Sequence, residues 1–176
     1  MKKSAATLLT KQRFWEIIAN SNQGETLADE LRQLTKDELF GYVYWWDYFH
    51  RESYNQALWA VAYTVMGGCS NDGFDYFRYW LVSLGENTYI SALANADSLC
   101  DAFDDCDYPE NEGIAYIPMD VYEEKFNNDY YAEEATYDFG SRERPPLNFE
   151  WKEDDEDSIK KIIPNTFAKW WGNNHF

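Results

Sequence analysis

The chain has 176 residues, of which 45% are hydrophobic and 19% aromatic, and its formal net charge is −17. This length suits one domain with a substantial core, and no apolar run approaches the roughly 18 residues that a membrane-spanning helix needs. The negative charge argues against binding to nucleic acid or to an anionic membrane, because both would repel it, whereas it would attract a basic protein partner.

The first third of the chain has the apolar spacing of helices. Thr10 is a candidate N-cap for a first helix, whose apolar residues fall on one side. A second helix is predicted over about residues 25–34. Thr35 and Glu38 then form a capping-box pattern, in which each side chain satisfies an exposed backbone donor of the other. This pattern begins a third helix, which runs to about Arg51.

A fourth helix is predicted over about residues 53–66. It is apolar over most of its circumference, so we expect it to be the most buried element. Gly67-Gly68 should end it, because glycine accepts the left-handed conformation that terminates helices. A fifth helix, over about 73–84, should then be capped by Asn71 or Asp72.

The signal weakens along the rest of the chain. Two shorter helices are expected over 86–95 and 97–104, the second opened by Asp97 or Ser98. An acidic loop follows, and it ends at Pro118, a residue type that favours the first turn of a helix. Further on, the sequence predicts irregular chain over 137–150, an acidic patch at 153–157 and a final apolar segment. The fold class is therefore mainly α: a compact multi-helix single domain with an irregular, acidic C-terminal third.

The cysteines indicate a reducing compartment. Cys69, Cys100 and Cys106 are odd in number and form no paired framework, as is usual for reduced thiols. The basic start of the chain is not followed by the apolar core of a signal peptide. We therefore expect a soluble, cytoplasmic protein.

The stretch "MGGCSNDGFDYFRYWL" admits two interpretations. Cys69 lies just before a predicted helix, which is a favourable place for a thiol nucleophile. However, neither His50 nor His175 stands at a spacing typical of a Cys-His pair. We interpret the stretch as helix end, tight turn and helix start. In the alternative, a small enzyme has its site at this turn, with Cys69, Asp72 and Arg78 as candidate residues.

Asp72, Asp75 and Arg78 recur every third residue along one face of the fifth predicted helix. We interpret them as a cap and an ion pair within the helix, worth a few tenths of a kcal/mol.

Most of the negative charge lies in one stretch. Residues 101–138 hold 13 acidic residues and one basic residue. Several tyrosines stand among these acids, so the stretch resembles a binding face more than a plain solvated surface. The residues expected to bind a partner are Asp101, Asp104, Asp105, Asp107, Tyr108, Glu110, Glu112, Tyr116, Tyr122 and Glu123.

No cofactor or metal is expected. The acids around Cys100 and Cys106 do not follow the order of a calcium-binding EF-hand loop. A zinc site would need more Cys or His at close spacing. No phosphate-binding glycine pattern accompanies Gly67-Gly68.

Residues 67–74 (GGCSNDGF) and 77–81 (FRYWL) resemble a bacterial family, the domain of unknown function 4240. Phe14-Trp15, Leu58-Trp59, Ala62-Tyr63 and Ala96-Asp97-Ser98-Leu99 support the resemblance, which covers about residues 10–125. The family commonly has an acid at the position of Asn71. The resemblance implies a helical core over 10–125, on which residues 126–176 pack as an extension within a single domain of residues 1–176.

The resemblance supplies no catalytic residues. It indicates a function only through the kind of protein that the chain resembles. Small acidic bacterial proteins of this kind are often immunity proteins, so we expect no enzyme but an inhibitory protein that binds a toxin or another basic enzyme 1:1. The alternatives are the small enzyme at the Gly67–Arg78 turn and an adaptor that mimics nucleic acid.

Overall fold

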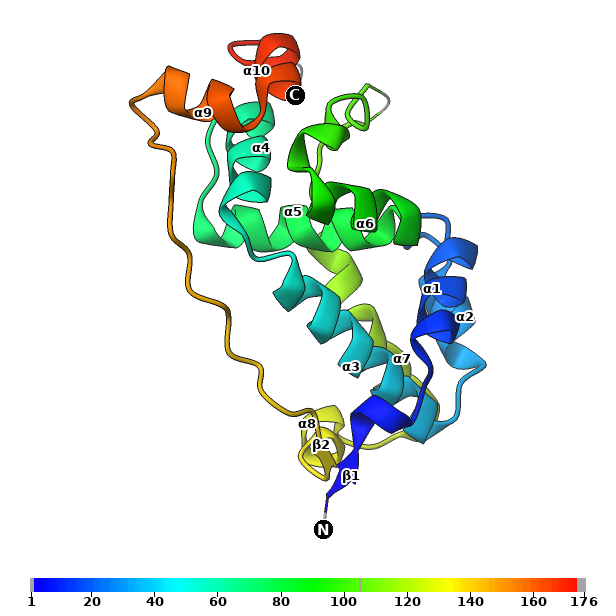
Figure 1. The fold of residues 1–176 in the computed structure, drawn as a ribbon. Coiled ribbons are helices and arrows are strands. Elements are labelled where there is room, and N and C mark those ends of the chain that lie inside the picture. The colour runs from blue at the N-terminus through cyan, green and yellow to red at the C-terminus, as the bar shows by residue number, and fades with distance from the viewer. Residues whose placement is uncertain (1, 105, 174–176) are drawn as a thin grey trace.

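The computed structural model describes residues 2–104 and 106–173 of the chain. The predicted mainly helical fold is confirmed, and among the described residues no helix is long and apolar enough to cross a membrane (Figure 1). The α-helices are α1 (Lys11–Asn20), α2 (Leu27–Arg32), α3 (Lys36–Glu52), α4 (Gln56–Met66), α5 (Asn71–Ser83), α6 (Glu86–Ala94), α7 (Ile117–Phe126), α8 (Tyr130–Glu134), α9 (Glu156–Ile162) and α10 (Pro164–Trp170).

Short elements connect these helices. Three 3-10 helices are described: η1 (Ala5–Thr7), η2 (Ala96–Leu99) and η3 (Gly113–Ala115). The two-residue strands β1 (Lys3–Ser4) and β2 (Tyr137–Asp138) pair in parallel. This pairing ties the start of the chain to the segment that follows α8.

Local capping chemistry sets several helix boundaries as predicted. The Thr10 hydroxyl accepts a hydrogen bond from the Arg13 amide at the start of α1. Thr35 and Glu38 form the full capping box at the start of α3. Gly67 ends α4 with a φ of +68°, the left-handed conformation that favours glycine.

Three predicted boundaries are wrong, because a good capping residue stands at a different position. Ser70, and neither Asn71 nor Asp72, caps α5 by accepting from the Gly73 amide at 3.1 Å. Asn55 caps α4, which therefore begins later than residue 53. Asn95 caps η2, so the helix predicted over 97–104 is a short 3-10 helix followed by turns. Serine and asparagine cap as well as aspartate does, and apolar spacing cannot choose among them.

Aromatic side chains fill the core between α1, α3 and α6. The rings of Trp15 and Phe49 lie 4.5 Å apart, and Tyr89 packs against both. The Tyr89 hydroxyl donates to the Phe49 carbonyl at 2.7 Å, which satisfies the polar end of a buried ring.

The C-terminal helices α9 and α10 pack on α4, at the end of the molecule far from β1 and β2 (Figure 1). Asp97 of η2 is the anchor. Its carboxylate accepts from the backbone amides of Asn165 and Thr166 at 3.0 and 2.8 Å. The Trp170 indole also donates to the Cys100 carbonyl at 2.8 Å.

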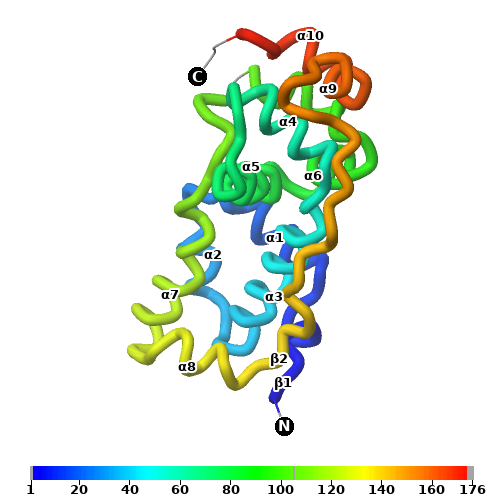
Figure 2. Tube along the Cα trace, turned by 90° about the vertical axis from the view of Figure 1, so that its left-hand side faces the viewer, coloured from blue at the N-terminus to red at the C-terminus, as the bar shows by residue number. Residues whose placement is uncertain are grey.

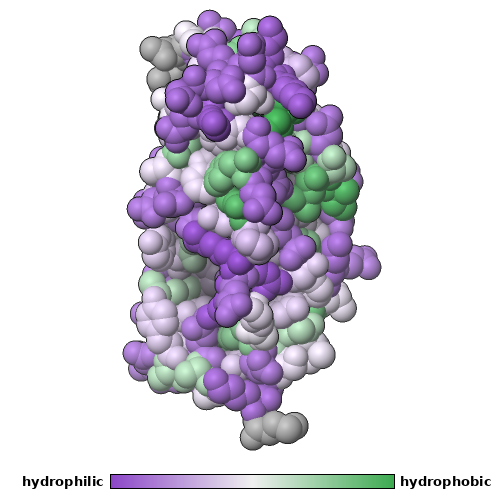
Figure 3. Space-filling view, turned by 60° about the vertical axis from the view of Figure 1, so that its left-hand side comes forward, coloured by the Kyte–Doolittle hydropathy of each residue, from purple (hydrophilic) through white to green (hydrophobic). Residues whose placement is uncertain are grey.

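Residues 139–150, which we call the strap, connect β2 to α9 as an extended and mostly exposed chain. They run along one edge of the molecule (Figure 2). On the face that carries them, hydrophilic side chains form a nearly continuous band between smaller apolar patches (Figure 3). Irregular chain was predicted for this region.

Candidate functional site

A cleft of about 580 Å³ opens beside the strap. Its walls come from α3, α5, the residues around η3 and the start of α7, α8 and the strap itself. Four carboxylates and four arginines line it, together with several tyrosines. Asp47, Asp72, Asp75 and Glu134 are the acids, and Arg51, Arg78, Arg142 and Arg144 are the bases.

Arg78 of α5 is fully buried at the base of the cleft. Its Nε donates to the Phe74 carbonyl at 3.3 Å, and its other nitrogens donate to the His50 carbonyl and the Asp75 carboxylate. The guanidinium also lies 4.9 Å from the ring centre of Tyr54. Burial lowers the pKa of Arg78 to about 10, against the opposing effect of Asp75. The sequence predicts the Asp75–Arg78 pair as a weak ion pair within the helix, but the full burial of Arg78 makes the pair part of the core.

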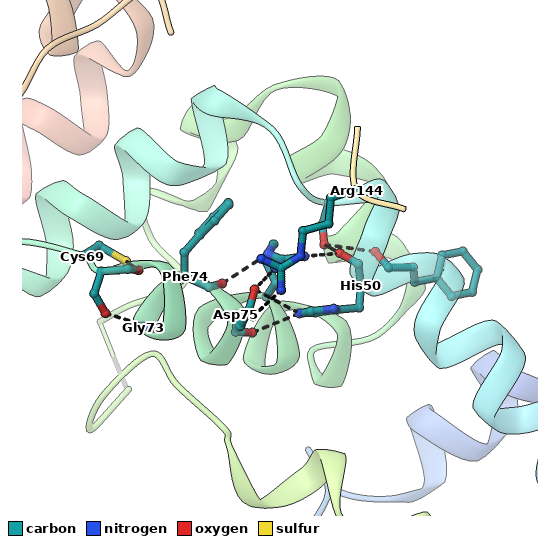
Figure 4. Close-up of polar contacts among 10 residues, drawn as sticks. His50, Cys69, Gly73, Phe74, Asp75 and Arg144 are labelled. Carbon is teal, nitrogen blue, oxygen red and sulfur yellow. Dashed lines mark hydrogen bonds and ion pairs between the residues drawn. The ribbon is translucent and has the colours of Figure 1, made fainter. Parts of the chain in front are cut away.

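Asp75 joins three basic groups (Figure 4). Its carboxylate pairs with both Arg78 and Arg144 and lies 3.9 Å from the His50 Nε2. The His50 ring stacks on Tyr79 with a centroid distance of 4.2 Å. Burial, with the nearby Arg78 charge, lowers the pKa of His50 to about 2, so the imidazole is neutral at physiological pH. The cluster therefore holds two guanidinium groups on one carboxylate.

Arg142, the other strap arginine in the cleft, binds a separate pair of carboxylates. Arg142 contacts Asp47 of α3 at 2.8 Å and Glu134 of α8 at 2.9 Å. Burial raises the pKa of Asp47 to about 6, although Arg142 opposes the shift. The proximity of Glu134 adds to the shift, because two nearby carboxylates disfavour each other's charge.

Cys69 does not belong to this group. It lies just before Ser70, the N-cap of α5, apart from the residues around Asp75 (Figure 4), and is not among the residues that line the cleft. Burial raises the pKa of its thiol to about 12, so the thiol is protonated and lacks the activation that a nucleophile needs. Of the three candidate residues of the enzyme hypothesis, the cleft thus brings together Asp72 and Arg78. His175 lies outside the described residues.

The acidic segment, residues 101–123, passes along the edge of the molecule opposite the strap in Figure 2. Asp101 and Asp104 share the ammonium group of Lys169 in α10, at 2.9 and 2.6 Å. Asp107 and Glu110 are exposed, and Tyr108 is 40% exposed. Asp105 lies outside the described residues.

The second half of the acidic segment reaches the cleft. Glu112 accepts a hydrogen bond from the Tyr76 hydroxyl at 3.1 Å, and Tyr116, which is 51% exposed, lines the cleft. Glu123 is exposed on α7 and accepts from the Tyr130 amide. The described partner-binding residues therefore lie on a path that begins beside α10, passes the rim of the cleft and ends on α7.

Tyr122 is a correction to the predicted binding residues. Its side chain is fully buried, with its ring 5.4 Å from that of Phe40 and its hydroxyl donating to Glu133. The ring is part of the core and cannot contact a partner.

Sequence reasoning missed the residues that complete the cleft, namely Asp47, Glu134, Arg142 and Arg144. One signal was present: Arg142 and Arg144 stand two residues apart, before Pro145-Pro146, and in extended chain such residues point to the same side. Two of their carboxylate partners are far away in the sequence: Asp75 and Asp47 lie 69 or more residues before the arginines that they contact. Within the described part of the chain, no group of three or more His, Cys, Asp or Glu is placed to hold a metal ion.

Comparison with known proteins gives a family. No curated protein and no solved structure matches the chain. A family model described as "Protein of unknown function (DUF4240)" matches residues 9–124, which include α1 to α6, the acidic segment and most of α7. The strap lies beyond the match. Because the match covers more than half of the chain, the protein belongs to the DUF4240 family.

Proposed function

We propose that the chain is an acidic inhibitory protein that binds a basic enzyme 1:1, as an immunity protein binds its toxin. The observation that carries the proposal is the charge of the acidic segment, which holds eight Asp or Glu residues and no Lys or Arg. Such a surface accelerates encounter with a basic partner and disfavours acidic ones.

The chain leaves part of this charge unneutralised. Lys169 serves Asp101 and Asp104 together. Asp107 and Glu110 are exposed, and neither forms an ion pair within the described residues. These two carboxylates are therefore available to the lysines or arginines of a partner, with no internal pair to break first.

Exposed tyrosines give the segment the second property of a binding surface. Tyr108 and Tyr116 are 40% and 51% exposed and stand among the acids. Tyrosine combines apolar area with a hydroxyl group and is enriched among the residues that contribute most binding energy at interfaces. The partner that fits is an enzyme with a basic cleft, such as one that acts on nucleic acid or nucleotides, and covering that cleft would inhibit it.

Affinity purification of the tagged protein from its own host, at low and high salt, tests the proposal. We expect one stoichiometric basic enzyme that is inhibited by the added protein. The charge-reversed pair Asp107→Lys/Glu110→Lys should lose it. The matched control Asp154→Lys/Asp157→Lys changes the same net charge at exposed positions, one before α9 and one in its first turn, and it should retain the partner.

Equal retention by both variants would contradict the role of the acidic segment, and the absence of any partner at low salt would contradict the function. Competition by DNA or RNA for the captured enzyme would favour nucleic-acid mimicry, since mimicry requires both ligands to occupy one site.

A further inference from the structure

Phe139 packs on Phe40 and Phe149 packs on Trp59 at the two ends of the strap. Between these ends, two arginines attach the strap to the helical body. Arg142 reaches Asp47 and Glu134, and Arg144 reaches Asp75. The strap residues from 141 to 150 are exposed except for half-buried Leu147. Few backbone groups hold this chain: the Ser141 carbonyl accepts from Arg51, and the Glu150 amide donates to Gln56. The arginine contacts are therefore the main link between the strap and the cleft.

The carboxylates are less exposed than the arginines that they bind. The side chains of Asp75, Glu134 and Asp47 are 19%, 20% and 36% exposed, against 45% for Arg144 and 46% for Arg142. The acids belong to the helices α3, α5 and α8, whereas the arginines belong to extended chain. In each ion pair, the carboxylate is therefore held in place by a helix of the folded body.

The position of Asp75 also has an aromatic surface that suits a guanidinium group. The Arg144 guanidinium lies 5.1 Å from the ring centre of Tyr54, whereas the ring nearest Arg142, that of Phe139 at 4.2 Å, belongs to the strap itself. A planar guanidinium pairs with carboxylates and stacks on rings, whereas an ammonium group does so less well. Without the strap, four carboxylates would face only two arginines in the cleft, which would make it acidic.

We propose that the cleft is a guanidinium-binding site for an arginine-bearing segment of the basic partner, and that the strap is an internal ligand that such a segment displaces. The inference rests on the proposed function, because a basic partner is what supplies the arginines. The cleft is continuous with the proposed surface: Tyr116 belongs to the acidic segment and also lines the cleft, and Tyr131, which is 64% exposed, lines it from α8.

A peptide experiment tests the site without the natural partner. The probe is a synthetic peptide with the sequence of residues 139–149, and its control has both arginines replaced by citrulline, which keeps the shape and removes the charge. Binding is measured by calorimetry to the wild-type chain and to Arg142→Gln/Arg144→Gln. A strap that occupies its site more than nine-tenths of the time should weaken peptide binding to the wild type by about tenfold or more.

We therefore expect the arginine peptide to bind the double variant at least tenfold more tightly than the wild type, and the citrulline peptide to bind neither. Adding Asp47→Asn and Glu134→Gln to the double variant, which leaves the buried Asp75–Arg78 pair intact, should weaken binding of the arginine peptide at least tenfold. Equal binding of the two peptides, or equal affinity for wild type and double variant, would overturn the inference. If the double variant loses its helical content, the single variants Arg142→Gln and Arg144→Gln should each show an intermediate gain, and no gain in either would overturn it.

The result is separable from that of the proposed function. A protein that binds the peptide but retains no basic enzyme from its host keeps the guanidinium site and loses the inhibitory role. One that retains the enzyme but discriminates neither peptide nor variant keeps the inhibitory role and loses this site.

Discussion

Replacing Arg78 with methionine should be strongly destabilising. The side chain is fully buried and donates to the carbonyls of Phe74 and His50 and to the Asp75 carboxylate. Removing one partner of a buried ion pair typically costs about 3–5 kcal/mol, because the other charge stays behind without compensation. Asp75 keeps its contact with Arg144, which is half exposed. We therefore expect a loss near the lower end, about 3 kcal/mol.

Thermal and urea unfolding would measure this loss. For a chain of this length, about 3 kcal/mol corresponds to a fall in Tm of about 6–12 °C. Arg144→Gln is the matched control, since it removes a half-exposed arginine from the same carboxylate and should cost about 1 kcal/mol or less. Replacing both Asp75 and Arg78 with apolar residues should cost less than Arg78→Met alone. A loss below 1 kcal/mol for Arg78→Met would refute the role of the buried pair.

Three further predictions concern titrating groups. With its pKa raised to about 12, Cys69 should resist iodoacetamide at pH 8 in the folded chain and react in urea; equal rates would refute its burial. Although burial opposes the shift, hydrogen bonds from Thr166 and Asn165 lower the pKa of Asp97. Its contribution to stability is therefore present above the unfolded pKa of about 4 and is lost as pH falls through the folded pKa. Asp97→Asn should remove this acid-dependent part of the urea midpoint, and an unchanged pH profile would count against the role of Asp97 as the anchor. The pKa of Asp47 is shifted in the opposite direction, so its contribution to stability is present below about pH 4 and is lost as pH rises through about 6. Carboxyl NMR should find that Arg142→Gln raises the pKa of Asp47 further. A titration of Asp47 near 4 would contradict its placement.

The parts of the fold that local chemistry controls were predictable. The capping box at Thr35, the cap at Thr10 and the stop at Gly67 depend on residues within one helical turn, so the sequence alone identifies them. The same locality limits precision. The sequence does not single out Ser70 and Asn95 as caps, because serine, asparagine and aspartate residues within a few positions of one another are all acceptable caps.

The site was less predictable because it depends on long-range contacts. Tyr122 was assigned to the surface from its acidic neighbours in the sequence, yet its ring packs on Phe40 in α3. Helical spacing places Arg78 on one face with Asp72 and Asp75 but does not show that the side chain is buried, with contacts to α3 and Tyr54. The pairing of the strap arginines with Asp47 and Asp75 joins residues that no periodicity relates. Cleft residues of this kind become visible only once the chain is folded.

The association rate of the chain with its captured enzyme tests the central claim most directly. It should be measured at several salt concentrations for the wild type, for Asp107→Lys/Glu110→Lys and for the control Asp154→Lys/Asp157→Lys. We predict that the first variant associates about tenfold or more slowly at low salt, that salt narrows this difference, and that the control behaves as the wild type. Equal association rates for the two variants would contradict the account, because the acidic segment would then have no part in recognition.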